Sequence, residues 1–168
     1  PHKGANILKN SLKKIISKID KKKFEKIRLV TVGRKSSFSF DIKGIHWTHL
    51  GLVKSIKKLN LLYRSADLLA CPSTYDTGPH CVTEALLNDL PVVAFDQGVA
   101  HDTVIDGYNG YLVKCFDKPG YAKSIYKELF LKKIKINNTK LKKIKNYFNP
   151  LNEANSIIKI AKMDSIEL

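Results

Sequence analysis

Long apolar runs are missing from this 168-residue sequence. The longest uninterrupted ones cover residues 68–71 and 91–95, whereas a membrane-spanning helix needs roughly 18 apolar residues. The first residues also lack the apolar core of a secretory signal peptide. These absences argue against an integral membrane protein and against a secreted one, and we expect a cytoplasmic location.

Cysteine is scarce as well. Cys71, Cys81 and Cys115 are odd in number and lie far apart, which fits neither a disulfide framework nor a zinc-binding pattern. We predict that all three are reduced thiols and that the chain holds no metal.

Acidic residues and arginine are in short supply. Lysine and arginine number 30 against 15 aspartates and glutamates, which gives a formal net charge of +15, and only Arg28, Arg34 and Arg64 are arginine. Lysine, isoleucine and asparagine are all abundant, as codon bias in an AT-rich genome would produce. Two interpretations stay open: a solvated lysine surface, or a basic surface that faces anionic lipid or a phosphorylated ligand.

The sequence does contain a regular alternation of two patterns. Apolar residues at helical spacing alternate with short runs rich in β-branched or apolar residues, and a lysine run at residues 21–23 breaks the first helical pattern. Strands are predicted over residues 27–32, 45–50, 66–71, 91–95 and 111–113, and helices over residues 5–19, 53–64, 79–88, 99–105, 120–134, 138–148 and 151–163. This order predicts one α/β domain over residues 1–168, with a doubly wound, mostly parallel sheet.

Ligands bind to such sheets beyond the carboxyl ends of the strands. The most informative of these positions follows the strand at residues 66–71, where a loop carries Asp76 and Gly78 and a helix begins near Pro79. The unpaired amides and the dipole at the start of that helix favour a phosphate or diphosphate. The carboxylates of Asp76 and Glu84 are placed to accept hydrogen bonds from sugar hydroxyls. The alternative is that Asp76 caps the helix and Glu84 is a solvated helix residue.

Five sequence blocks follow one another along the chain: Lys3-Gly4, residues 62–67, Pro72-Ser73 with Asp76 and Glu84-Ala85, residues 91–94 and residues 106–113. In this order and spacing they resemble the donor-binding half of glycosyltransferase family 4, which has the two-domain GT-B fold. The resemblance covers roughly residues 2–130, and the chain looks most like enzymes of bacterial surface-polysaccharide assembly, such as those that make lipopolysaccharide.

The resemblance implies a role for each matched residue. Glu84 is expected to bind the ribose hydroxyls of a nucleotide diphosphate sugar, Asp76 to contact the donor hexose, and Lys3 to neutralise the departing diphosphate. Asp76 and Glu84 are therefore the candidate catalytic residues. Backbone groups expected to line the diphosphate and sugar belong to Gly78, His80, Cys81 and Val82.

The implied reaction is hexosyl transfer with retention of anomeric configuration, to a polysaccharide or a lipid-linked glycan, without metal or cofactor. Association with the inner face of the cell membrane is a further expectation. The alternative function is a basic, non-catalytic module that binds anionic membrane or nucleic acid. It depends on charge alone, and nucleic acid is not expected because no nucleic-acid-binding motif is present.

Three positions depart from the family pattern, and one is Gly78, which stands where a phenylalanine is usual before Pro79 and should make the loop more mobile. Asp89 stands where a helix-ending glycine is usual, and aspartate tolerates the left-handed conformation needed there. Val99 replaces a glycine in the loop after residues 91–95.

The family's first strand and its N-terminal acceptor domain have no counterpart here. The chain also begins at Pro1 and has Met163 as its single methionine, as expected for part of a longer protein. We therefore expect a gap in the sheet, or its completion by another segment, and donor binding without turnover by the isolated chain.

Overall fold

A computed structural model describes residues 3–34, 39–76 and 78–136, together with Asn146, Asn149 and Leu151. The chain divides into two compact units, Pro1–Lys135 and Ile136–Leu168, and the fold below is that of the first unit. The helices expected over residues 138–148 and 151–163 lie outside the described residues, apart from these three positions. The expectation of a single nucleotide-sugar-binding domain stays a prediction.

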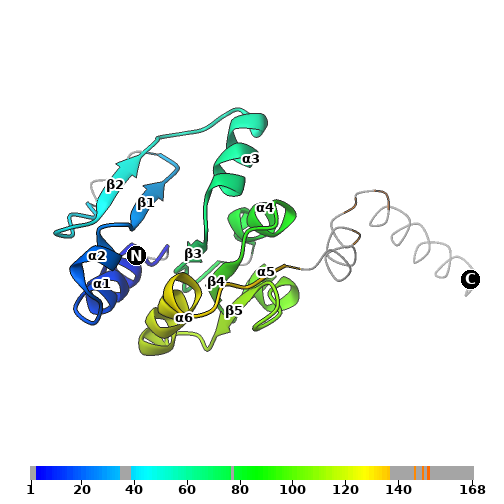
Figure 1. The fold of residues 1–168 in the computed structure, drawn as a ribbon. Coiled ribbons are helices and arrows are strands. Elements are labelled where there is room, and N and C mark those ends of the chain that lie inside the picture. Colours follow the sequence, from blue (N-terminus) through cyan, green and yellow to red (C-terminus); the bar gives the residue numbers. More distant parts are fainter. Residues whose placement is uncertain are drawn as a thin grey trace, which may run out of the picture. The chain divides into compact units, whose positions relative to one another are not determined.

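Helices and strands alternate along the first unit as the sequence pattern predicts (Figure 1). In chain order they are α1 (Ala5–Ile16), α2 (Lys21–Phe24), β1 (Arg28–Thr31), β2 (His46–His49), α3 (Ile56–Ser65), β3 (Leu69–Cys71), α4 (His80–Leu87), β4 (Val92–Phe95), α5 (Gly98–Thr103), β5 (Gly110–Val113) and α6 (Lys118–Phe130). Among the described residues, no helix is long and apolar enough to cross a bilayer.

All strand pairs in the described part of the chain are parallel, which confirms the predicted fold class. β1 pairs with β2, and β3, β4 and β5 pair in that order. The strands thus form two sheets rather than one, and the described residues include no strand that joins β1 to β3 (Figure 1). A gap of this kind is one of the two outcomes that the sequence predicts.

The three-stranded sheet is covered on both faces. Successive side chains of a strand point to opposite faces, and along β4 they enter two different apolar clusters. Val93 and Phe95 pack with α1 and α6, where the rings of Phe95 and Tyr121 stack with centroids 4.9 Å apart. Val92 and Ala94 pack with α4 and α5. Burial of β4 on both faces explains its unbroken apolar sequence.

A buried asparagine holds the turn between α5 and β5. The Oδ1 of Asn109 accepts a hydrogen bond from the Ile105 amide at 2.7 Å, and its Nδ2 donates to the Thr103 carbonyl at 2.9 Å. The side chain is fully buried, so both of its polar groups are satisfied within the turn. This accounts for the asparagine in the block at residues 106–113 by local structure.

The first helix ends before the lysine run, as the sequence pattern predicts. Residues 21–23 also begin the short helix α2, which the pattern did not predict. Its N-cap is Asp20, whose carboxylate accepts a hydrogen bond from the Lys23 amide at 3.0 Å. Apolar periodicity cannot detect so short a helix, whereas the cap residue could have indicated it.

The left-handed conformation expected at Asp89 is confirmed by its φ of 60°.

The start of α1 lies against the end of β3. Gly4 has a φ of 65°, and a Cβ atom built on it would lie 1.8 Å from the carbonyl oxygen of Pro72. Only a glycine allows this approach, because the neighbouring atom is backbone and the left-handed region disfavours residues with a Cβ. The contact places Lys3 beside the loop that follows β3.

We predict that Gly4→Ala destabilises the domain more than Gly51→Ala does. Gly51 has a similar φ of 67°, but an added Cβ would meet nothing within 4 Å, so its substitution measures the conformational cost alone. Gly4→Ala adds a backbone clash and is expected to lower the free energy of unfolding by about 1–3 kcal/mol more. Urea unfolding of both variants measures the difference, and equal losses would contradict the close approach.

Candidate functional site

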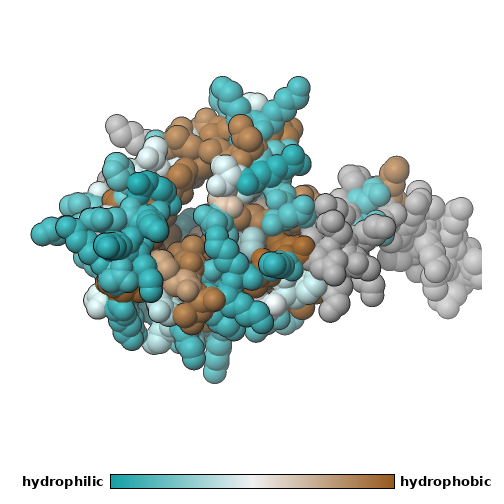
Figure 2. Space-filling model, viewed as in Figure 1, coloured by the Kyte–Doolittle hydropathy of each residue, from teal (hydrophilic) through white to brown (hydrophobic). Residues whose placement is uncertain are grey.

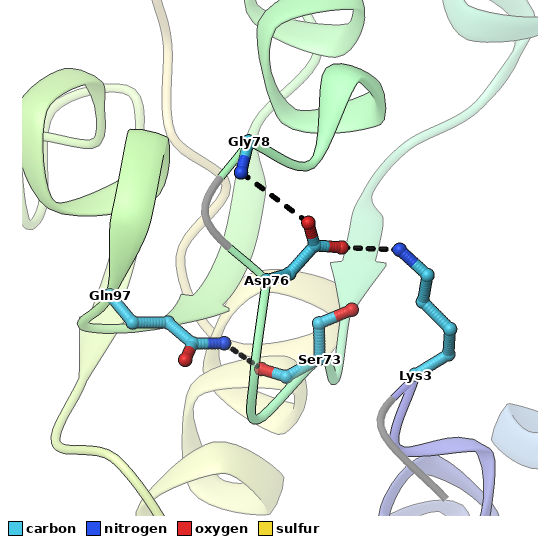
Figure 3. A network of polar contacts seen from close by, with 5 residues as sticks. All are labelled: Lys3, Ser73, Asp76, Gly78 and Gln97. Atoms are coloured by element: carbon cyan, nitrogen blue, oxygen red, sulfur yellow. Dashed lines mark hydrogen bonds and ion pairs between the residues drawn. The ribbon is translucent and has the colours of Figure 1, made fainter.

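Polar side chains from three separate segments meet beyond the carboxyl end of β3 (Figure 3). The loop after β3 supplies Ser73 and Asp76, the chain segment before α1 supplies Lys3, and the two-residue connection between β4 and α5 supplies Gln97. The Nε2 of Gln97 donates to the Ser73 carbonyl at 2.6 Å, which ties the loop to the end of β4. The sequence predicted this edge of the sheet as the ligand site but did not single out Gln97.

Asp76 is at the centre of these contacts. One carboxylate oxygen accepts from the ammonium of Lys3, and the other accepts from the Gly78 amide at 3.4 Å. The Asp76 side chain is 15% exposed and that of Lys3 is 77% exposed. The bond to Gly78, two residues on, closes a local turn. Asp76 is therefore held within its own loop, and the N-cap of α4 is Pro79, which has no side-chain cap.

The ion pair changes the acid–base behaviour of Lys3. Its hydrogen bond with Asp76 is the main cause that raises the pKa of Lys3 above the ordinary 10.5, and partial burial opposes the shift. The charged form of the lysine is favoured because a carboxylate lies beside it. Lys3 thus presents a permanent positive charge at the edge of the sheet.

Glu84 lies on α4 and is held by α3. Its Oε2 accepts a hydrogen bond from the Tyr63 hydroxyl at 2.7 Å, and its backbone carbonyl accepts from the Asn88 Nδ2 at 2.9 Å. Burial, and next the bond to Glu84, raise the pKa of the Tyr63 hydroxyl, so the phenol stays a donor. Glu84 is half-buried and not a fully solvated helix residue. Tyr63 lies in the block at residues 62–67, yet its contact with Glu84 was not predicted.

The start of α4 is available to an anion. The first amides of a helix have no partner within it, and no side chain caps this one. The Val82 amide already donates to the Pro79 carbonyl at 2.8 Å. Of the helix residues whose backbone was predicted to line the diphosphate, His80 and Cys81 therefore remain as amide donors at the start of α4. A Cβ atom added at Gly78 would meet nothing within 4 Å, so the space before the helix is open.

The cysteines flank the same loop. Cys71 ends β3 and is buried, Cys81 is half-buried in the first turn of α4, and both are free, as is Cys115. The contact between the two thiols is the main cause that lowers the pKa of Cys71 and raises that of Cys81. That all three are reduced thiols stays a prediction.

A second polar pair lies at the end of β4. The Nδ1 of His101 is 2.5 Å from the Oδ1 of Asp96, and this contact raises the pKa of His101. The Val99 side chain beside it packs against the cluster under α4 and α5. Asp96 thus forms a local contact with α5.

Comparison with known proteins bears on the fold and the family. A family model described as "Glycosyl transferases group 1" matches residues 1–145. The chain is similar to the structure of HepE (Alr3699) of Anabaena in complex with UDP-glucose, at 22% identity and a TM-score of 0.57, over 77% of this chain and 36% of that one. It is similar to HepE in complex with UDP and glucose at 21% identity and a TM-score of 0.59, over 78% and 36%.

The structural likeness at this identity concerns the fold alone. The chain spans 36% of the length of the HepE chains in these two structures. A search of curated proteins found no match.

We predict that Asp76→Asn lowers the pKa of Lys3. A raised pKa in the folded state means that the ion pair stabilises the fold fully below pH 10.5 and ceases to do so as the pH rises through the raised value. NMR titration of the lysine side chains measures the shift. Asp67→Asn is the matched control, because Asp67 raises the pKa of Lys133 by the same kind of contact and should leave Lys3 unchanged. An unchanged Lys3 in Asp76→Asn would contradict the pair.

Proposed function

Because this chain belongs to the glycosyl transferases group 1 family, we propose that it is the donor-binding part of a retaining hexosyltransferase. The donor is a nucleotide diphosphate sugar, and the acceptor is a polysaccharide or a lipid-linked glycan. The observation that supports this most directly is the meeting of Lys3, Asp76 and the start of α4 beyond the carboxyl end of β3.

The diphosphate is proposed to bind at the start of α4. The open space at Gly78 lets its oxygens approach the forward amides of His80 and Cys81, and the helix dipole favours negative charge there. Lys3 adds a full positive charge on the other side of the loop. Charge that develops on the departing diphosphate is stabilised by groups already in position, which is the main requirement of this reaction.

The carboxylates of Glu84 and Asp76 are proposed to bind the two sugars of the donor. Glu84, held by Tyr63, is proposed to accept hydrogen bonds from the ribose hydroxyls, and Asp76 from the hexose. The sugar acquires oxocarbenium character as the diphosphate leaves, and the acceptor hydroxyl attacks the same face. No metal enters this proposal, because Lys3 and the helix supply the positive charge.

The pairing of Lys3 with Asp76 has a consequence for donor binding. The Lys3 ammonium has three N–H donors, so it can bind a diphosphate while it keeps its contact with Asp76, and the remaining lone pairs of the carboxylate can accept from the hexose. The isolated chain is proposed to bind donor without turnover, since the acceptor half of a GT-B cleft is not among these residues.

Glu84→Gln is expected to weaken UDP binding about 10- to 150-fold. It removes a charge-assisted acceptor worth on the order of 1.5–3 kcal/mol while keeping the shape.

Asp76→Asn is expected to weaken UDP-glucose binding and to leave UDP binding nearly unchanged, because Asp76 is proposed to contact the sugar. Calorimetric titration of both variants with both ligands tests the assignment. If Glu84→Gln binds UDP as tightly as the parent, this segment is not a donor site.

Tyr63→Phe is expected to weaken UDP binding about 5- to 10-fold, since a phenol that fixes a carboxylate contributes roughly 1–1.5 kcal/mol through its hydrogen bond. The matched control uses the ligand: 2′,3′-dideoxy-UDP lacks the ribose hydroxyls, so Tyr63→Phe and the parent should bind it equally. Equal losses for both nucleotides would mean that Tyr63 supports the fold and not the ribose contact.

A further inference from the structure

A hollow of the first unit lies between α1 and α6, and neither Lys3 nor Asp76 lines it. It has a volume of about 630 Å³, within the range of pockets that bind small molecules. Its apolar lining comes from Ile15 on α1 and from the α6 side, where Leu131 is 68% exposed. The other apolar lining residues are Pro119, Ala122 and Tyr126.

Four lysines surround this hollow. Lys14 and Lys18 come from the α1 side, Lys123 and Lys127 come from α6, and all four are exposed. Within the described residues none of them forms an ion pair, although the Lys127 ammonium lies 4.8 Å from the centroid of the Tyr111 ring. Figure 2 shows hydrophilic side chains gathered over the side of the molecule that carries α1 and α2.

No carboxylate balances these charges on the two helices. α1 contains no acidic residue, and the one acidic residue of α6, Glu128, is buried. Both oxygens of Glu128 face the Ile134 amide, at 3.0 and 3.2 Å. The hollow therefore combines an apolar lining with an unbalanced positive rim, which is the complement of a molecule with an apolar body and an anionic head.

We propose that this α1/α6 hollow binds an anionic membrane lipid, with an acyl chain against Pro119, Tyr126 and Leu131 and the phosphate between the lysines. Long lysine side chains suit this role because their stems extend along apolar surface while their ammonium groups reach the headgroups. The domain would thereby be held at an anionic leaflet through a surface distinct from the donor site.

Other occupants fit less well. The chain's own residues 136–168 carry six lysines against Glu153, Asp164 and Glu167, and a second copy carries a net charge of +15, so both are repelled by the rim. Nucleic acid would satisfy the lysines but not the apolar lining. An acidic amphipathic helix of a partner protein would satisfy both the lysines and the apolar lining. However, a helix with its side chains is about 10–12 Å across, and the volume of the hollow matches a small ligand better.

The test compares binding of the 168-residue chain to phosphatidylglycerol and phosphatidylcholine vesicles. We expect binding to the anionic vesicles alone. Lys14→Gln with Lys123→Gln should weaken it about 30-fold, and Leu131→Asp about 10-fold. The matched control, Lys54→Gln with Lys57→Gln, removes the same charge from exposed positions outside the hollow, and we expect a loss below about 3-fold because remote charges are screened. Thermal unfolding verifies that each variant is folded.

Three outcomes would overturn the proposal. Equal losses from the two lysine pairs would assign vesicle binding to net charge. Equal binding to both vesicle types would show that the chain does not recognise the anionic headgroup. If an acidic amphipathic peptide displaces the chain from the vesicles, and Leu131→Asp binds the vesicles as tightly as the parent, the four lysines serve a protein partner and not a lipid. UDP titration of the same variants should be unchanged, so failure here is distinguishable from failure of the proposed donor site.

Discussion

The site depends on one close backbone approach, that of Gly4 to the carbonyl of Pro72. This contact fixes the start of α1 against the end of β3, and α1 in turn buries its apolar face against α6 and the strands. Lys3, one residue earlier, therefore reaches a loop 73 positions further along the chain. A side chain at residue 4 would separate the ammonium from the carboxylate, even though neither charged group would have been altered.

Helix α4 carries two of the groups that the candidate site depends on. α4 presents its unpaired amides to the open space at Gly78 and its carboxylate at Glu84 to α3. α3 contains no fully buried residue, yet its Tyr63 hydroxyl fixes the orientation of Glu84. A helix without a fully buried residue thus holds the carboxylate that we propose for the ribose contact. The more deeply buried strand β4 supplies the rigid support beneath.

Local patterns were enough to predict most of the fold, because β-branched runs and helical spacing are properties of neighbouring residues. Ser55 as N-cap explains why α3 begins at Ile56 and not at residue 53. The same patterns placed Asp76 in the loop after β3 and Glu84 on the helix that follows it. They could not predict the Lys3–Asp76 and Tyr63–Glu84 contacts, because these join residues far apart in sequence. They also missed α2, whose four residues are too few for any apolar period.

The division of the strands into two sheets bears on how the protein behaves at high concentration. β1 and β3 each have one edge without a strand partner among the described residues. Unpaired amides and carbonyls along such edges are templates for intermolecular pairing, and Val30, on β1, is 50% exposed. Opposing this, a charge of +15 keeps copies apart at low salt. Colloidal stability therefore depends on ionic strength, because salt screens the repulsion and leaves the edges unchanged.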